Sequence, residues 1–352
     1  MQGGLTAELS LKPNLQPTEL ERRGERFAFG APVTGAVTAQ GAVVVSFGDG
    51  MVRFFRADEK PFEVQAHQGV VLCIVADGNH VLTGGDDGRC LRISPEGKIE
   101  ELASFGTRWV DCVAASHGHR ACSSGRAVHL WAAGDRRANI LEHPSTVGGL
   151  AFDAKGKRLA VTQYGGATVW GREKRWRSKK LIWKGFHGQT TFSPDGKFLV
   201  TAMQENTLHA WRLRGKGAFT MPGYKSKIKS LVWVGEAPHL VTSGEDEAIA
   251  WPFDGKDGPT GRKPVCVAYN DDELVSALCP LPDQEAVFAG FRDGTVQLAE
   301  LDQSKSAFSI SSATGAEVTA IAVEGMHLLV GDARGSVLWA PLKAGERYAR
   351  NV

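Results

Sequence analysis

Two neighbouring stretches decide the fold: LAFDAKGKRLAVTQYGGATVW at residues 150–170 and TTFSPDGKFLVTAMQENTLHAW at residues 190–211. Each begins with a short apolar strand, passes through a polar turn into a second strand, and ends in a third strand that finishes on tryptophan. Six further stretches follow the same order. The eight copies start near residues 33, 70, 110, 147, 187, 228, 275 and 318, about 41 residues apart.

The copies indicate a ring of small β-sheets. Each expected strand has about five residues and is rich in Val, Leu and Ala, which favours strands over helices. A sheet this small cannot bury both faces alone, but radial stacking of successive sheets does so and leaves only short edges. Glycine turns such as GDG at 48–50 supply the positive φ that tight hairpins need. We predict an all-β propeller of eight blades, each with four antiparallel strands, and keep seven blades as the alternative.

We expect the ring to close through its N-terminal part. A fourth, less regular strand follows the third in most copies, whereas ERFAFG at 25–30 has no copy of its own. Pairing of this segment with the last sheet would remove a free edge. The result is one propeller domain over 24–345 and a C-terminal tail over 346–352. For the N-terminal extension over 1–23, a flexible tail, a strap across the ring and a partner-binding segment stay open.

These residues resemble the WD-repeat family of β-propellers over about residues 25–341. The resemblance rests on the period, on FSPDGK at 192–197 and on the tryptophan that ends the third strand. That tryptophan occurs as Trp131, Trp170, Trp211 and Trp251. The resemblance implies a protein-binding scaffold, since WD-repeat propellers usually serve as assembly platforms.

The family also implies a hydrogen-bond network of His, Ser or Thr, Asp and Trp within each blade. In the second copy His67, Thr83 and Asp87 match, and Ile93 stands in the tryptophan position. The fourth copy matches through His143, Thr162 and Trp170, with Tyr164 and glycine at the turn. We interpret these histidines as structural.

Composition excludes several classes of protein. Charged residues make up 23% of the 352 and apolar residues 42%, as in an ordinary globular chain. The longest apolar run, Val70–Ala76, is too short for a membrane helix, and the first residues contain no signal peptide. The six cysteines show no zinc spacing, so we interpret them as buried reduced thiols, with disulfides as the alternative. We predict a cytoplasmic monomer without membrane insertion.

No sequence motif indicates an enzyme. GxSxG, HExxH, Walker and GxGxxG patterns are missing from fitting contexts. Acidic turns at 86–87, 245–247 and 271–273 are typical of solvated loops, with calcium binding as the alternative. Some eight-bladed propellers are quinone-cofactor dehydrogenases with adjacent cysteines, and this chain has no such pair. We predict no catalytic residue, no metal and no cofactor.

Charge is distributed unevenly along the chain. Residues 171–229 contain fourteen Lys and Arg against three acidic residues, a net charge of +11, which leaves −9 elsewhere. In a propeller, the turns after the first and third strands lie on one face, so this charge predicts a basic face. The candidate basic patch is Lys155, Lys157, Arg172, Lys174, Arg175, Trp176, Arg177, Lys179, Lys180, Arg212, Arg214 and Lys216. Lysines that only keep strand edges soluble are the alternative.

The opposite rim is expected to bind proteins. It consists of the loops that enter first strands and those that join second to third strands, and aromatic residues and Arg are common interface anchors. The candidate rim residues are Arg108, Trp109, Tyr164, Phe186, Met203, Tyr224, Phe291 and Arg292. Packing within the blades is the alternative for several of them, and Arg108 and Trp109 are the two that we expect to be exposed. We predict a non-enzymatic scaffold for one or more proteins, some of them acidic. Binding of nucleic acid or another polyanion by the basic face is the second hypothesis, and a propeller enzyme the third.

Overall fold

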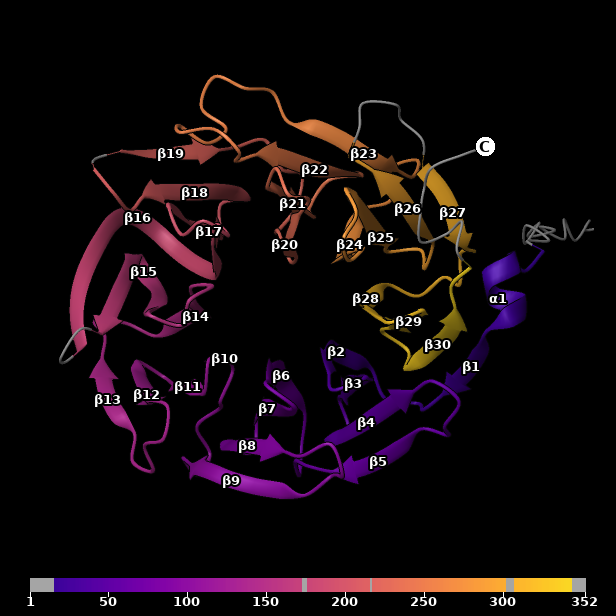
Figure 1. The fold of residues 1–352 in the computed structure, drawn as a ribbon, viewed down its shortest axis with the longest axis horizontal. Helices are drawn as coiled ribbons and strands as arrows, with labels where there is room; N and C mark the ends of the chain where they lie inside the picture. The colour runs from indigo at the N-terminus through magenta and orange to yellow at the C-terminus, as the bar shows by residue number, and fades with distance from the viewer. Residues whose placement is uncertain (1–15, 173–175, 216, 302–306, 344–352) are drawn as a thin grey trace, which may run out of the picture.

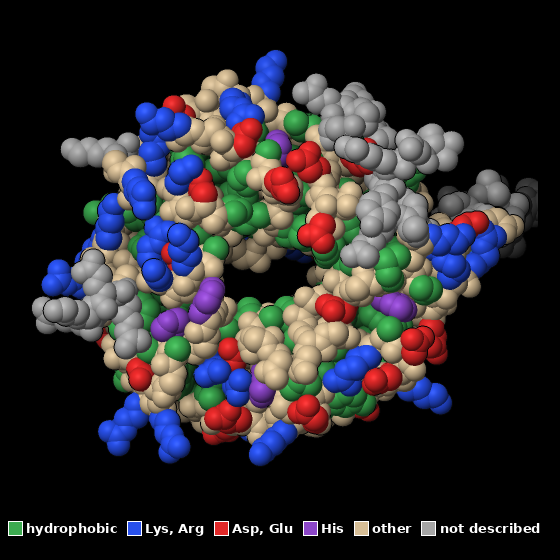
Figure 2. Space-filling view, viewed as in Figure 1, with side chains coloured by type: hydrophobic (Ala, Val, Ile, Leu, Met, Phe, Trp, Pro, Cys, Tyr) green, Lys and Arg blue, Asp and Glu red, His purple; other side chains and the backbone are tan. Residues whose placement is uncertain are grey.

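The computed structural model describes residues 16–172, 176–215, 217–301 and 307–343. The described chain is almost entirely β-structure, and its small antiparallel sheets follow one another around a central opening (Figure 1). The opening stays visible when side chains are drawn as spheres (Figure 2). The prediction of an all-β propeller is confirmed.

Six of the sheets have four strands each, in simple up-and-down order in five of them. The first three sheets are β2 (Val33–Ala39), β3 (Ala42–Phe47), β4 (Met51–Arg56) and β5 (Phe62–Gln65); β6 (Val71–Asp77), β7 (His80–Gly85), β8 (Arg89–Ile93) and β9 (Ile99–Ser104); and β10 (Val113–Ser116), β11 (His119–Ser124), β12 (Ala127–Trp131) and β13 (Asn139–Glu142). Two later sheets are β20 (Leu231–Val234), β21 (His239–Thr242), β22 (Glu247–Pro252) and β23 (Val265–Tyr269); and β24 (Val275–Pro280), β25 (Ala286–Phe291), β26 (Val296–Glu300) and β27 (Ala307–Ser311). The closing sheet contains β28 (Val318–Glu324), β29 (His327–Asp332), β30 (Ser336–Pro341) and β1 (Glu25–Ala28).

The fourth and fifth copies share one six-stranded sheet. Its strands are β14 (Val147–Phe152), β15 (Arg158–Arg172), β16 (Trp176–Phe192), β17 (Phe198–Met203), β18 (Thr207–Arg212) and β19 (Ala218–Met221). β15 pairs with β14 through residues 159–163 and with β16 from Tyr164 onward, and β16 pairs with β17 from His187.

Counted as hydrogen-bonded sheets, the described ring has seven units. The prediction of eight separate four-stranded blades is therefore not supported, and the count of seven is the one we kept as the alternative. The difference arises in one place. β15 and β16 are 15 and 17 residues long, because each runs without a break through positions where we expected one strand to end and another to begin.

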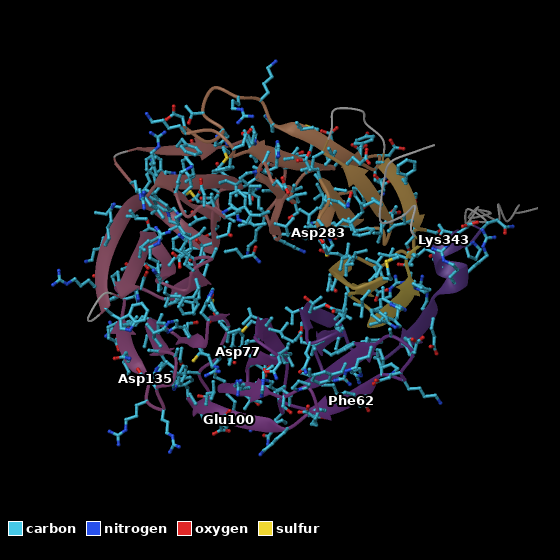
Figure 3. All side chains as sticks on the ribbon, in the orientation of Figure 1. Phe62, Asp77, Glu100, Asp135, Asp283 and Lys343 are labelled. Carbon is cyan, nitrogen blue, oxygen red and sulfur yellow. The ribbon has the colours of Figure 1, made fainter. Side chains whose placement is uncertain are left out.

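The first strand of each sheet lies near the opening and the fourth lies outside. Figure 3 shows Asp77, at the end of β6, closer to the opening than Phe62 of β5 or Glu100 of β9. Second strands lie between, and β3, β17 and β25 are buried at every position. This burial on both faces follows from the radial stacking of neighbouring sheets.

The N-terminal strand closes the ring, as predicted. β1 pairs with β30 in an antiparallel register that places Glu25 opposite Trp339. Helix α1 (Glu19–Arg23) precedes it and begins with a capping box between Thr18 and Glu21. Leu20 of α1 is buried in the core between β24–β27 and the closing sheet. Thr18 Oγ1 donates a hydrogen bond of 2.6 Å to the Ile310 carbonyl, so this end of the extension is fixed to the propeller.

Candidate interaction surfaces

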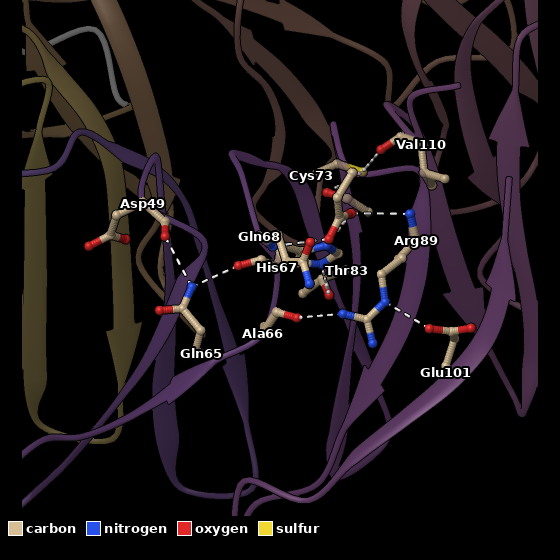
Figure 4. A network of polar contacts seen from close by, with 12 residues as sticks. Asp49, Gln65, Ala66, His67, Gln68, Cys73, Thr83, Arg89, Glu101 and Val110 are labelled. Atoms are coloured by element: carbon tan, nitrogen blue, oxygen red, sulfur yellow. Dashed lines mark hydrogen bonds and ion pairs between the residues drawn. The ribbon is translucent and has the colours of Figure 1, made fainter. Parts of the chain in front are cut away.

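The second repeat contains the hydrogen-bond network that the sequence predicts. His67 Nδ1 lies 2.9 Å from Asp87 Oδ1, and its Nε2 lies 2.9 Å from Thr83 Oγ1 (Figure 4). Asp87 also accepts hydrogen bonds from the backbone N–H groups of Gln68 and Arg89. These bonds lower the pKa of Asp87 although burial opposes them, and burial lowers the pKa of His67. The histidine ties the entry loop to the turn between β7 and β8.

Other repeats use altered versions of this network. In the fourth repeat Trp170 Nε1 donates to His143 Nε2 at 3.4 Å, but Thr162 Oγ1 donates to the Gly188 carbonyl instead. In the sixth repeat Tyr224 takes the place of histidine, and its hydroxyl contacts Thr242 Oγ1 and Trp251 Nε1, each at 2.7 Å. Burial raises the pKa of Tyr224 to about 12.

The fifth repeat contains a histidine network that our sequence analysis missed. His187 is fully buried, with Nδ1 2.8 Å from Thr201 Oγ1 and Nε2 3.3 Å from the Trp183 carbonyl. A carbonyl only accepts, so Nε2 carries the proton and Nδ1 accepts from Thr201. The signal was present in the sequence, because His187 precedes a first strand as His67 and His143 do.

Part of the predicted basic patch forms one pocket on the face seen in Figure 2, where Lys and Arg gather over β14–β19. The turn after β14 and the turn after β16 meet there around a cavity of about 380 Å³. Its basic lining residues are Lys155, Lys157, Arg158 and Arg214. Arg158 Nε binds Asp153 at 2.8 Å. No ion pair joins Lys155, Lys157 or Arg214 to an acidic group in the described residues.

The remaining basic-patch residues do not form a single surface with this pocket. Lys179 Nζ donates to the Leu213 carbonyl at 3.3 Å, and Arg212 pairs with Asp257 at 2.6 Å. Arg177 and Lys180 are exposed on β16. Lys174, Arg175, Lys216 and the side chain of Arg172 lie outside the described residues.

Trp176, a member of the candidate basic patch, packs into the protein. Its ring is partly buried, packs against the core around Leu150 and Phe152, and lies edge-on to His119. The tryptophan thus contributes to packing between β10–β13 and the following sheet.

The predicted rim residues divide into exposed and buried groups. Trp109 and Tyr164 are 61% and 65% exposed, and Arg108 and Arg292 are also exposed. Phe186 is half-buried. The prediction that Met203, Tyr224 and Phe291 lie on the surface is wrong, because all three are buried. Phe291 packs between two sheets, Tyr224 belongs to the sixth-repeat network, and the Met203 methyl group lies beneath Gly185.

Five large exposed hydrophobic residues escaped the sequence analysis: Ile140, Ile182, Trp183, Tyr269 and Phe308. Ile182 is 80% exposed and Trp183 is 38% exposed, both on β16. They follow the basic residues of this strand, and we had weighed that stretch for its charge alone. Cys266 is likewise exposed, against the prediction of buried thiols, and all six cysteines are free.

Two of the three acidic turns, at 86–87 and 245–247, contact basic groups of the protein. Lys225 Nζ lies 2.6 Å from Asp246 and 3.6 Å from Glu245, and Asp87 is bound to His67. Across the described part of the chain, no group of three or more His, Cys, Asp or Glu residues is arranged to hold a metal ion. No described helix has the length and apolar character needed to cross a membrane.

The ring and the His–Thr–Asp network define a WD-type β-propeller. A family model for the WD domain, G-beta repeat, matches residues 59–91. Among solved structures, the chain superposes on the C-terminal WD40 domain of Sif2 with a TM-score of 0.72, at 16% identity, covering 91% of this chain and 99% of that one. The computationally designed Ika8 protein gives a TM-score of 0.74 at 18% identity, covering 90% and 98%. The chain thus has the β-propeller fold of these structures, and its residues 59–91 match a WD repeat.

Curated relatives match only part of the chain. The ribosome biogenesis protein WDR12 homolog of Drosophila mojavensis is 27% identical over 113 residues, which is 30% of this chain and 26% of that protein. The Drosophila willistoni homolog is 32% identical over 57 residues, 15% of this chain and 14% of that protein. The chain therefore matches about a quarter or less of the length of these relatives.

Proposed function

We propose that this chain is a non-enzymatic scaffold that acts as a monomer and binds one or more proteins through its rim. The observation that carries the proposal is the exposure of Trp109, on the loop that enters β10, and of Tyr164, on β15, at 61% and 65%. Large aromatic side chains in water mark interfaces when they gather on one surface. Arg108 and Arg292 are exposed on loops and add the cationic groups that interfaces favour.

The names of the matched relatives support a place in a macromolecular assembly. Those proteins are named for ribosome biogenesis, which favours a site of ribosome assembly over the general cytoplasmic location that we predicted. The basic face would suit such surroundings.

Affinity capture of the tagged full chain from its native cell, read by mass spectrometry, tests the scaffold. We expect at least one protein at near-stoichiometric yield that is lost from the double variant Trp109→Ser, Tyr164→Ser. Both positions are exposed, so the variant should keep the wild-type thermal midpoint. The control is Tyr269→Ser, which removes an exposed aromatic ring from β23. Equal recovery of every partner by wild type and double variant would refute a role for the rim.

A second function, binding of a polyanion, is favoured by the pocket around Lys155, Lys157 and Arg214. Three cations without carboxylate partners in the described residues leave a local excess of positive charge. Phosphate contacts of this kind make affinity fall steeply with salt, in proportion to the number of cations engaged.

Retention on heparin over a salt gradient tests this second function. Lys155→Glu, Lys157→Glu and Arg214→Glu together should elute at clearly lower salt than wild type. The matched control is Arg136→Glu with Arg137→Glu, since both arginines are exposed on the turn between β12 and β13, a connection of the same type. An equal shift from pocket and control variants, corrected for the number of charges reversed, would mean that only net charge matters.

A further inference from the structure

β16 changes partners at an unusual bulge. Gly166 pairs with Ile182 and Tyr164 pairs with Phe186, so residues 183–185 all lie opposite Gly165. Gly185 has φ +102, and a Cβ atom there would lie 2.8 Å from both Met203 Cε and Glu205 Oε1. The position therefore requires glycine for its backbone conformation and for its space. Bulges of this kind redirect side chains away from the sheet.

Trp183 is held in place from two sides. Its ring stacks on His209 with centroids 4.2 Å apart and planes 21° apart, and its carbonyl accepts the His187 hydrogen bond. His209 is fully buried, and neither of its ring nitrogens has a hydrogen-bond partner among the described residues. The imidazole ring of His209 thus covers and supports one face of the Trp183 indole. An indole fixed in this way loses little further entropy when a partner binds.

The surroundings of Trp183 are apolar and cationic. Ile182 and Tyr164 are 80% and 65% exposed, and the pairing of β15 with β16 places them at the same end of the ladder. Lys180 shares one face of β16 with Ile182, and Lys184 lies within the bulge. Both lysines are exposed, and neither has an ion-pair partner within the described ranges. We call Tyr164, Lys180, Ile182, Trp183 and Lys184 the bulge patch.

We propose that the bulge patch binds an acidic segment of a partner protein through an apolar anchor side chain. The inference rests on the proposed scaffold function and assigns it a surface. A protein segment fits better than a nucleic acid because Ile182, the most exposed apolar residue of the patch, has no ring on which a base could stack. One face of Trp183 already lies on His209, so a base could not be sandwiched there. The two unpaired lysines complement carboxylates beside the anchor.

Selection from a random-peptide display library on the immobilised full chain tests the proposal. We expect enriched peptides with at least one large apolar residue among Asp and Glu. Their binding should weaken by about tenfold or more in Trp183→Ala and in Ile182→Ser, as is usual for central interface residues. Ile182→Ser keeps the test valid if Trp183→Ala uncovers His209 and disturbs the fold. Ile140→Ser, which removes an exposed apolar side chain from β13, is the matched control for Ile182→Ser and should bind as wild type does.

Charge is tested in the same assay. Lys180→Glu with Lys184→Glu should abolish the selected binding, whereas Arg136→Glu with Arg137→Glu should not. Three results would overturn the proposal: no enrichment, enrichment of peptides that bind the Ile182→Ser variant equally well, or stronger patch-dependent binding of single-stranded oligothymidine than of any peptide. The scaffold function fails separately, if affinity capture yields no partner that depends on the rim.

Discussion

The sheet β6–β9 and the six-stranded sheet β14–β19 each contain a buried histidine that holds the segment before a strand. The two histidines do so through different hydrogen-bond partners. In β6–β9, His67 bonds to Thr83 on one side and to the carboxylate of Asp87 on the other. In β14–β19, His187 bonds to Thr201, but its second partner is the carbonyl of Trp183.

The comparison shows what the carboxylate does. Asp87 accepts from the loop and from its own turn, so the entry loop of β6 is fixed close to the ring. Where His187 has no such partner, it holds the preceding segment by the backbone of a bulge, in which Trp183 is partly exposed and Lys184 is exposed. The two sheets thus differ in whether the segment before the strand leaves an apolar side chain at the surface.

The largest effect should come from His67→Phe. This substitution removes both bonds of a fully buried ring and leaves Thr83 and Asp87 without their partner. We expect a loss of about 4 kcal/mol in the free energy of unfolding, measured by urea titration with circular dichroism. The same change at His209, whose nitrogens have no partner in the described residues, should cost less than about 1 kcal/mol. Similar losses at both positions would contradict the comparison.

A smaller effect is expected from acid. Burial and the neighbouring His187 lower the pKa of His209 to about 4, whereas an unfolded histidine titrates near 6.5. The unfolded state therefore takes up the proton first, and stability falls as pH drops from about 6.5 towards 4, with no contribution above that window. This histidine should account for about 3 kcal/mol of the loss. His209→Phe should flatten the profile by that amount, and an unchanged slope would show that His209 is not buried in its neutral form.

The smallest effect compares two glycines of the bulge. Gly165 has φ +87 and nothing within 4 Å of a Cβ, whereas Gly185 has φ +102 and two close atoms. Gly165→Ala should cost about 1 kcal/mol from backbone conformation alone. Gly185→Ala should cost about 1 kcal/mol more, because Met203 and Glu205 must move. Equal thermal shifts for the two variants would show that the bulge accommodates a Cβ atom at residue 185 without a cost from Met203 or Glu205.

Sequence reasoning identified the repeats because strand alternation and turn glycines are local signals. The resemblance to WD-repeat propellers located His67, Thr83 and Asp87, and the segment that lacked a copy of its own placed β1 in the closing sheet. Sequence reasoning failed at Met203, Tyr224 and Phe291, since a residue next to a turn faces either the solvent or the neighbouring sheet. Burial there depends on packing between repeats, which the order of residues within one repeat does not contain.

The prediction of where strands end at the junction of the fourth and fifth copies was wrong for a related reason. We expected a turn at Tyr164 and the glycine beside it, yet the β15 ladder continues past Gly165 and Gly166 with a bulge. Whether a glycine ends a strand or bends it depends on the strand opposite. The exposed Ile182 and Trp183 escaped notice because they are apolar residues in a stretch dominated by charge.

Because β1 pairs with β30, with Glu25 opposite Trp339, the ring can close only after β30 has been made. The strand made first on the ribosome finds its hydrogen-bond partner only after almost all of the chain has emerged. Until then β28–β30 and β1 are separate pieces with open edges, and closing a loop of this length is slow. The nascent protein therefore stays an open arc until β28–β30 have been made, and pairing of β1 with β30 then closes the ring.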